Sequence, residues 1–161
     1  MKKILFFFTI FFIYGCVDIK NNSKETATID CPAVYFSTEN NTYIDGEEMD
    51  LSLDKVNYKA SLNNYRFSNE CNSYENFNNF NLDLLIIIDP INPQIKNVNI
   101  PIFLLIYNFD NILIDKQFFR VESDINYNFE TDEYLETEIV KKLNINVSKE
   151  TQVGNIIIGF V

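Results

Sequence analysis

The sequence predicts an all-β protein whose single domain follows an N-terminal signal segment. From residue 31 onward, apolar and polar residues alternate in several short runs, which is typical of half-buried strands. Segments rich in Asn, Asp and Pro separate these runs and favour turns. Residues 100–107 are apolar without a break but too short to cross a membrane, which indicates a buried strand. About seven strands are expected, and this number favours an immunoglobulin-like antiparallel β-sandwich over a barrel.

The N-terminus has the pattern of an export signal. Lys2 and Lys3 precede an apolar run over residues 4–14, and the small residue Gly15 lies directly before Cys16. A transmembrane helix needs about 20 apolar residues, roughly twice the length of this run. The segment is therefore interpreted as a cleaved signal peptide rather than a membrane span.

The end of this signal resembles the lipobox of bacterial lipoproteins, in which signal peptidase II cuts before a diacylglycerol-bearing cysteine. The resemblance covers residues 13–16 and departs from the usual pattern at Tyr14, where a small residue is more common. It implies a signal peptide at 1–15 and lipidation of Cys16, whose acyl chains make dissociation from a membrane negligible. Val17 stands where an inner-membrane retention signal has Asp, which favours the outer membrane. The periplasmic face of that membrane is the expected side, and exposure to the cell exterior is the alternative. The alternative is an ordinary secretory signal with a chance cysteine.

The cysteine count agrees with an exported lipoprotein. The chain has three cysteines, Cys16, Cys31 and Cys71, and acylation of the first leaves an even number. Cys31 and Cys71 are then expected to form a disulfide in an oxidising periplasm, contributing roughly 4 kcal/mol through loop closure. The alternative is a pair of reduced, buried cysteines. With no histidine in the chain, a zinc site is not expected.

Charge and composition limit the partners and the number of domains. Removing residues 1–15 takes away two lysines and no acid, which changes the net charge from −10 to −12. Such a chain repels nucleic acid and anionic headgroups, so the membrane partner must be held by the lipid alone. Residues 16–30 are polar and aperiodic, which predicts a flexible tether of about 20 Å root-mean-square span. Residues 31–161 suffice for one domain.

The first part of the domain is expected to contain one short strand between loops. Residues 33–37 form the predicted strand, and Pro32 suits its start because proline donates no ladder hydrogen bond. Residues 38–48 are predicted to be a loop. Residues 69–79 are also predicted to be a loop, which carries Cys71.

Two longer strands follow from the period-2 pattern. Apolar residues alternate with polar ones over residues 55–65, the predicted main second strand, and residues 49–53 are a possible short edge piece. The next strand starts at Phe80 and becomes apolar on both sides in its second half. Pro90 is expected to end it.

The centre of the domain is predicted to be a β-hairpin. The apolar run 100–107 is expected to be a strand covered on both faces. Residues 108–111 form the turn, in which Asn accepts the left-handed backbone that Gly usually supplies. Residues 112–122 are the return strand.

The C-terminal part contains one ambiguous segment. Residues 131–146 fit strand alternation and also one helix face, with Glu138 and Lys142 spaced for a helical ion pair. A strand is preferred. Residues 155–161 are predicted to be the last strand, with Gly159 marking a bulge or a close approach of another chain segment.

Several short motifs resemble an uncharacterised lipoprotein family of alphaproteobacteria. These motifs are Cys31-Pro32, Cys71, the portions Ile112-Leu113 and Lys116 to Phe118 of the predicted hairpin, and Gly159-Phe160 near the end. The chain departs from this family at Asn111, where members usually have Gly, and at Val161, where members continue. The resemblance implies an envelope lipoprotein and implies no catalytic residue.

The chain carries no recognisable catalytic motif. It lacks histidine, the commonest general base, and it has neither a nucleophile elbow nor a glycine-rich phosphate loop. The acidic segments 45–54 and 130–138 do not match an EF-hand and are interpreted as solvated faces or loops. The sequence therefore predicts a protein that is not an enzyme and uses no cofactor or metal.

Two functions of different classes fit these observations. The first is a lipid-tethered envelope adaptor that binds an envelope protein through an edge strand or a loop. The second is a membrane-tethered module that binds a glycan or a small solute. The second hypothesis expects Tyr65, Phe67, Tyr74 and Phe77 to be exposed and gathered in one concave patch around the Cys71 loop.

Overall fold

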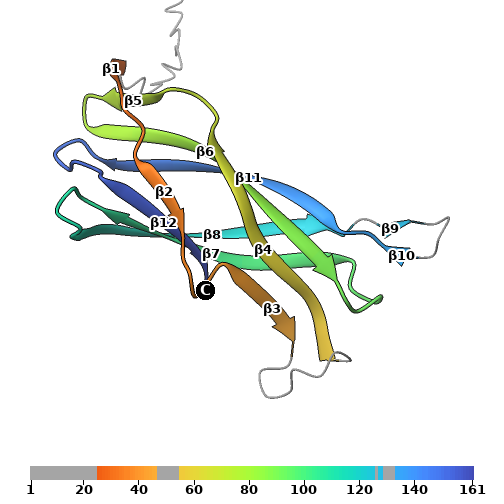
Figure 1. Cartoon of the computed structure of the whole chain (residues 1–161). Coiled ribbons are helices and arrows are strands. Elements are labelled where there is room, and N and C mark those ends of the chain that lie inside the picture. The colour runs from red at the N-terminus through yellow and green to blue at the C-terminus, as the bar shows by residue number, and fades with distance from the viewer. Residues whose placement is uncertain (1–24, 47–54, 126, 129–132) are drawn as a thin grey trace, which may run out of the picture.

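The computed structural model describes residues 25–46, 55–125, 127–128 and 133–161 (Figure 1). These residues form two packed sheets and no helix, so the predicted all-β sandwich class is confirmed. The six-stranded sheet is called the large sheet and the four-stranded one the small sheet. The large sheet contains β1 (Glu25–Ile29), β3 (Thr42–Gly46), β4 (Val56–Phe67), β5 (Cys71–Tyr74), β6 (Phe77–Pro90) and β11 (Thr137–Ser148). The small sheet contains β2 (Ala33–Phe36), β7 (Asn97–Tyr107), β8 (Leu113–Asp124) and β12 (Asn155–Phe160).

The large sheet is built around β6. On one side of β6, β11 runs antiparallel to it over residues 77–88. On the other side, β4 pairs with residues 82–90 of β6, and β5 pairs with residues 78–79. β3 extends the sheet beyond β4, and β1 extends it beyond β5. A separate two-residue pair, β9 (Tyr127–Asn128) and β10 (Glu133–Tyr134), stands outside both sheets.

The small sheet has the order β2-β12-β7-β8. β7 and β8 form the predicted antiparallel hairpin, and β12 lies antiparallel along the other side of β7. β2 pairs in parallel with β12. The two packed sheets thus contain ten strands rather than about seven, and an immunoglobulin-like strand order is not confirmed.

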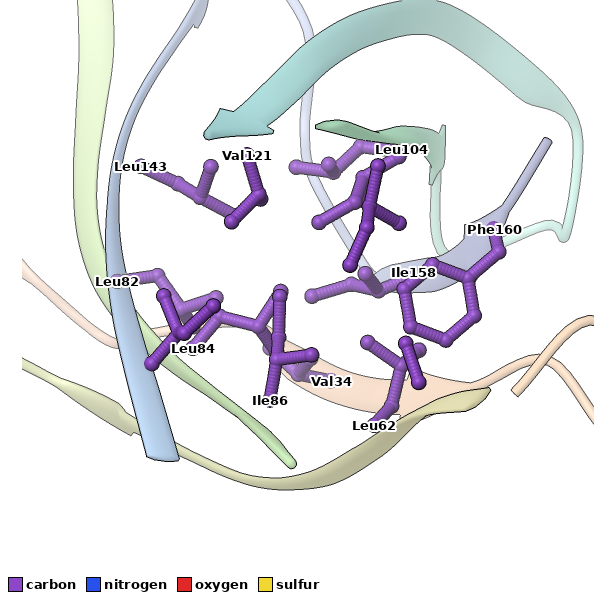
Figure 2. Close-up of a cluster of buried hydrophobic side chains, with 14 of the residues drawn as sticks. Val34, Leu62, Leu82, Leu84, Ile86, Leu104, Val121, Leu143, Ile158 and Phe160 are labelled. Carbon is purple, nitrogen blue, oxygen red and sulfur yellow. The ribbon is translucent and has the colours of Figure 1, made fainter. Parts of the chain in front are cut away.

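The core fills the space between the inner faces of the two sheets. Figure 2 shows side chains from both sheets pointing toward one another. The large sheet contributes Leu62, Leu82, Leu84, Ile86 and Leu143, and the small sheet contributes Val34, Leu104, Val121, Ile158 and Phe160. Their burial supplies the main driving force for packing the sheets together, at about 25 cal/mol per Å² of apolar surface.

The predicted tether is wrong at its C-terminal end. Residues 25–29, assigned to the tether, form β1, which pairs with β5 so that Ile29 lies opposite Cys71. A disulfide between Cys31 and Cys71 fixes the chain two residues after β1. This crosslink holds the short segment 25–29 beside β5. The composition of the segment alone does not indicate a strand.

Two predicted loops also contain strands. β3 lies inside the predicted loop 38–48, and the predicted loop 69–79 contains β5 and the start of β6. Both missed strands are short, and only alternate residues such as Tyr43 and Cys71 face the core. The possible edge piece at 49–53 lies outside the described residues.

The other predicted strands agree with the structure. The strands predicted at 33–37, 55–65, 80–90, 100–107, 112–122 and 155–161 correspond to β2, β4, β6, β7, β8 and β12. The ambiguous C-terminal segment is a strand, β11, over the described residues from Thr137. Asn111 has a φ of 58°, which confirms its predicted left-handed backbone in the hairpin turn.

Candidate interaction surface

The outer face of the small sheet carries a group of apolar side chains. The prediction that β7 is covered on both faces is wrong for this side, because the outward residues of β7 are only half-buried. In the strand register, Phe103 lies between Gly159 of β12 and Phe118 of β8. Side chains of directly paired residues share one face of a sheet. The outward residues of the four strands therefore form one continuous surface.

We call this surface the apolar face. Its members are Tyr35 from β2, Phe103, Leu105 and Tyr107 from β7, Leu113 and Phe118 from β8, and Ile157 from β12. Tyr35 and Phe118 are 58% and 60% exposed, and Leu113 is also exposed. Single exposed apolar residues are common on proteins, whereas large contiguous apolar patches are typical of interaction sites, so this surface is a candidate interaction site.

Part of the outer face of the large sheet is polar. Four asparagines from β6 and β11 form a network of side-chain hydrogen bonds there. Asn79 Nδ2 donates to Asn146 Oδ1 at 2.8 Å, and Asn144 Nδ2 donates to Asn81 Oδ1 at 2.8 Å. Three further bonds join Asn81 to Asn79, Asn146 to Asn144 and Asn79 to Asn144. Farther along β6 and β11, the outward residues Leu85 and Val140 are apolar, so only part of this face is polar.

Gly159 shapes the middle of the apolar face. A Cβ at this position would collide with the ring of Phe103 and lie 3.1 Å from the Cβ of Asn40. The predicted close approach at Gly159 is therefore confirmed. The glycine lets the Phe103 ring lie across β12, which flattens the surface.

Two cations stand on the outer side of β8 beside the aromatic rings. The Lys116 ammonium lies 4.9 Å from the centroid of the Phe118 ring, within cation–π range. Arg120 Nη1 donates a hydrogen bond to Asn99 Oδ1 at 3.2 Å. At the far end of the same face, a hollow of about 450 Å³ is lined by Glu122, Asp124 and neighbouring residues of β7 and β8.

The aromatic patch predicted around Cys71 is not exposed as expected. Tyr65 and Phe67 are partly buried and pack against the core. The Tyr65 ring contacts the rings of Phe36 and Phe67 edge to face, with centroid distances of 6.0 Å and 6.3 Å. Tyr74 and Phe77 stack on each other at 4.8 Å. Two of the four residues therefore pack against the core and are not fully exposed parts of a ligand platform.

The predicted site residues fall into two groups. Cys31 and Cys71 form a disulfide with a Cα–Cα distance of 5.3 Å, and Cys71 is fully buried. Cys16, the predicted lipidation site, lies outside the described residues. Within the described part, no helix is long and apolar enough to cross a membrane.

The electrostatics of the described residues do not assemble a reactive group. Burial, reinforced by the charge of Asp45, raises the pKa of Tyr58 to about 12 and also raises the pKa of Tyr43. Both phenols therefore stay protonated at neutral pH. In the described ranges, His, Cys, Asp and Glu side chains form no group of three placed to hold a metal ion.

The hydrophobic pattern of β7 was the one sequence signal of the apolar face. Over residues 100–107, the outward residues of this strand are apolar as well as the inward ones. A strand that is covered by a second layer has the same pattern. Searches for related proteins found no matching family model, no matching curated protein and no matching solved structure.

Proposed function

We propose that the protein is a lipoprotein anchored in the outer membrane of a bacterial envelope, where it acts as a non-catalytic adaptor. Its apolar face holds a partner protein of the envelope. The observation that carries this proposal is the contiguous apolar surface on the outside of the small sheet, with Tyr35 and Phe118 more than half exposed. Monomeric soluble proteins rarely leave such a surface in contact with water.

The anchor is proposed from the sequence pattern at residues 13–16. If Cys16 is acylated, only the eight residues 17–24 separate it from the first strand. Eight residues span at most about 29 Å when fully extended, so the domain stays close to the membrane. The disulfide is compatible with export to an oxidising compartment. The resemblance to alphaproteobacterial lipoproteins stays a prediction.

A protein partner fits the apolar face better than a lipid surface does. A bilayer is flat and extends beyond the footprint of the domain, so its anionic headgroups would also meet Glu122 and Asp124, whose charges offset those of Lys116 and Arg120 on the same strand face. The outward side of β8 therefore has no net attraction for anionic headgroups. A protein partner of limited size covers the apolar part alone. The glycan alternative has lost its main support, because Tyr65 and Phe67 pack against the core.

Photo-crosslinking in living cells tests the docking surface. A photo-reactive phenylalanine analogue replaces Phe118 in the native full chain, and in the matched control it replaces Val140. Val140 is 56% exposed but lies on the outer face of the large sheet. Position 118 is expected to give one discrete crosslinked species that is absent at position 140 and weakened by Phe103→Ser. Identical patterns from both positions would contradict the docking surface.

Fractionation tests the anchor separately. The native chain is expected to incorporate labelled palmitate and to sediment with outer membranes. Cys16→Ala is expected to lose both properties. An unlabelled native chain with the same distribution as the variant would exclude the lipoprotein part of the proposal.

A further inference from the structure

A β-bulge in β4 places Arg66 on the outer face of the large sheet. Residues 56, 58, 60 and 62 face the core, and continued alternation would turn Arg66 inward as well. The register shifts between Leu62 and Asn64, so that Tyr65 packs against the core and Arg66 points outward. Bulges commonly redirect side chains beside functional sites.

The Arg66 guanidinium pairs with a buried carboxylate. Its Nε lies 3.1 Å from Oδ2 of Asp83, while Oδ1 of Asp83 accepts a 2.7 Å hydrogen bond from the Ser68 hydroxyl. The Asp83 side chain is 7% exposed, whereas the Arg66 side chain is 78% exposed. The terminal nitrogens of the guanidinium remain as donors, in the planar geometry that matches a carboxylate.

Arg66 forms one end of a hollow of about 300 Å³ over β4, β6 and β11. Leu85 and Val140, which are paired across β6 and β11, supply its apolar lining. Glu138 lines the hollow from β11. In the described residues no ion pair joins Glu138 to another side chain.

The two ends of this hollow carry opposite charge. Arg66 and Asp83 line one end, and Lys142 lies beside them in the same row, just outside the lining. Together these three side chains give this end an excess of one positive charge. Glu138 lies opposite Ile87, four residues farther along β6, and gives the other end a negative charge. The apolar row of Leu85 and Val140 lies between the two ends.

We propose that this hollow binds a short zwitterionic peptide. Arg66 receives its terminal carboxylate, Glu138 receives its terminal ammonium group, and an apolar side chain lies on Leu85 and Val140. Arg66 and Glu138 are two strands and four residues apart, a backbone distance of about 16 Å. Both side chains line the hollow and shorten this span, which leaves room for two or three extended residues at about 3.3–3.6 Å each.

Arginine side-chain NMR tests this proposal directly, because the chain contains only two arginines, Arg66 and Arg120. The probe is the tripeptide alanyl-leucyl-alanine with free termini, titrated into ¹⁵N-arginine-labelled full chain in neutral detergent micelles. The Nε–Hε signal of Arg66 is expected to shift saturably. Arg120 lies on the small sheet, so its signal is an internal control that is expected to stay in place.

Modified probes and variants test the two charged contacts. Acetylating the amino terminus or amidating the carboxyl terminus is expected to weaken binding roughly threefold to fivefold, as for exposed ion pairs. Glu138→Gln is expected to remove the difference between the free and acetylated tripeptides. Lys59→Gln is the matched control, since it removes one exposed charge from β4 outside the hollow and is expected to leave affinity unchanged.

Three results would overturn the proposal: no shift at Arg66, equal shifts of both arginine signals, or equal affinity for all three forms of the tripeptide. None of them bears on the adaptor function, because the apolar face lies on the other sheet. Conversely, the absence of a crosslink at position 118 would not contradict peptide binding in the hollow beside Arg66.

Discussion

Gly159 is buried under the ring of Phe103, its neighbour across β12 and β7. Gly159→Ala adds a methyl group that meets this ring and the Cβ of Asn40. Overpacking of this kind costs about 1–3 kcal/mol of unfolding free energy. We expect a loss in this range, measured by urea denaturation of the full chain.

The Phe103 ring provides the control for this substitution. In a Phe103→Ala background, the added methyl group no longer meets the ring and only the contact with the Cβ of Asn40 remains, so the cost of Gly159→Ala is expected to shrink. A double-mutant cycle isolates this coupling because the two residues are in direct contact. Equal costs in both backgrounds would show that the ring is not what excludes a side chain at Gly159.

Asp83 links stability to pH. The hydrogen bond from Ser68 is the main cause that lowers its pKa, with Arg66 and Lys142 acting in the same direction against partial desolvation. Because the folded-state pKa is below the ordinary value of about 4, this group stabilises the fold fully above that value. The contribution is lost as pH falls through the folded-state pKa.

Asp83→Asn tests this linkage. The variant is expected to be less stable than the native chain at pH 7, and the difference is expected to shrink toward pH 3. Urea midpoints at the two pH values measure it. A difference that is independent of pH would mean that the carboxylate charge contributes nothing to folding.

The turn between β7 and β8 requires a left-handed residue. Asn111 has a φ of 58°, which suits Asn or Gly but strains a β-branched side chain. Asn111→Gly is expected to change stability by less than about 0.5 kcal/mol, whereas Asn111→Val is expected to cost roughly 1–3 kcal/mol. Thermal unfolding of both variants gives the comparison, and an equal effect would argue against turn strain.

The disulfide holds β1 to the rest of the large sheet. Cys31 and Cys71 are separated by 40 residues, so their crosslink is expected to contribute roughly 4 kcal/mol through the entropy of the unfolded chain. The double variant Cys31→Ala/Cys71→Ala should lose this amount in urea denaturation. Reduction of the native chain should lower its midpoint similarly and leave that of the variant unchanged. An unchanged midpoint in the variant would show that the pairing of β1 with β5 is stable without the crosslink.

Sequence periodicity predicted the long strands but not the short ones. β6 and β7 have five or more inward apolar residues each, which produces a clear alternating signal. β3 and β5 are only five and four residues long, too short for a clear alternating signal. Their strand conformation depends on pairing with β4, β6 and β1, which are tertiary contacts. The bulge in β4 was missed because Tyr65 continues the apolar pattern after one extra residue.

At the scale of the whole molecule, the candidate surface could not be predicted from the sequence. An apolar outer row on β7 predicts a covering layer and an uncovered docking face equally well. Only the arrangement of the two sheets shows that no described segment covers Phe103 and Phe118. The hollow beside Arg66 is likewise assembled from three strands far apart in the sequence.

An uncovered face predicts a separation between folding and binding. Tyr35→Ser and Phe118→Ser remove apolar side chains that are already more than half exposed in the folded state. Each is therefore expected to change the unfolding free energy by at most about 0.5 kcal/mol. The same variants are expected to reduce the fluorescence of a hydrophobic dye added to the native, detergent-free protein, because they remove the surface that binds it.

Val140→Ser is the matched control for this prediction, since it removes an exposed apolar side chain from the other sheet. It is expected to leave dye binding on the small sheet unchanged. A loss of more than about 2 kcal/mol in Phe118→Ser would instead place this ring in a structural contact. In that case the apolar face would be part of the packing of the domain and would no longer support a docked partner.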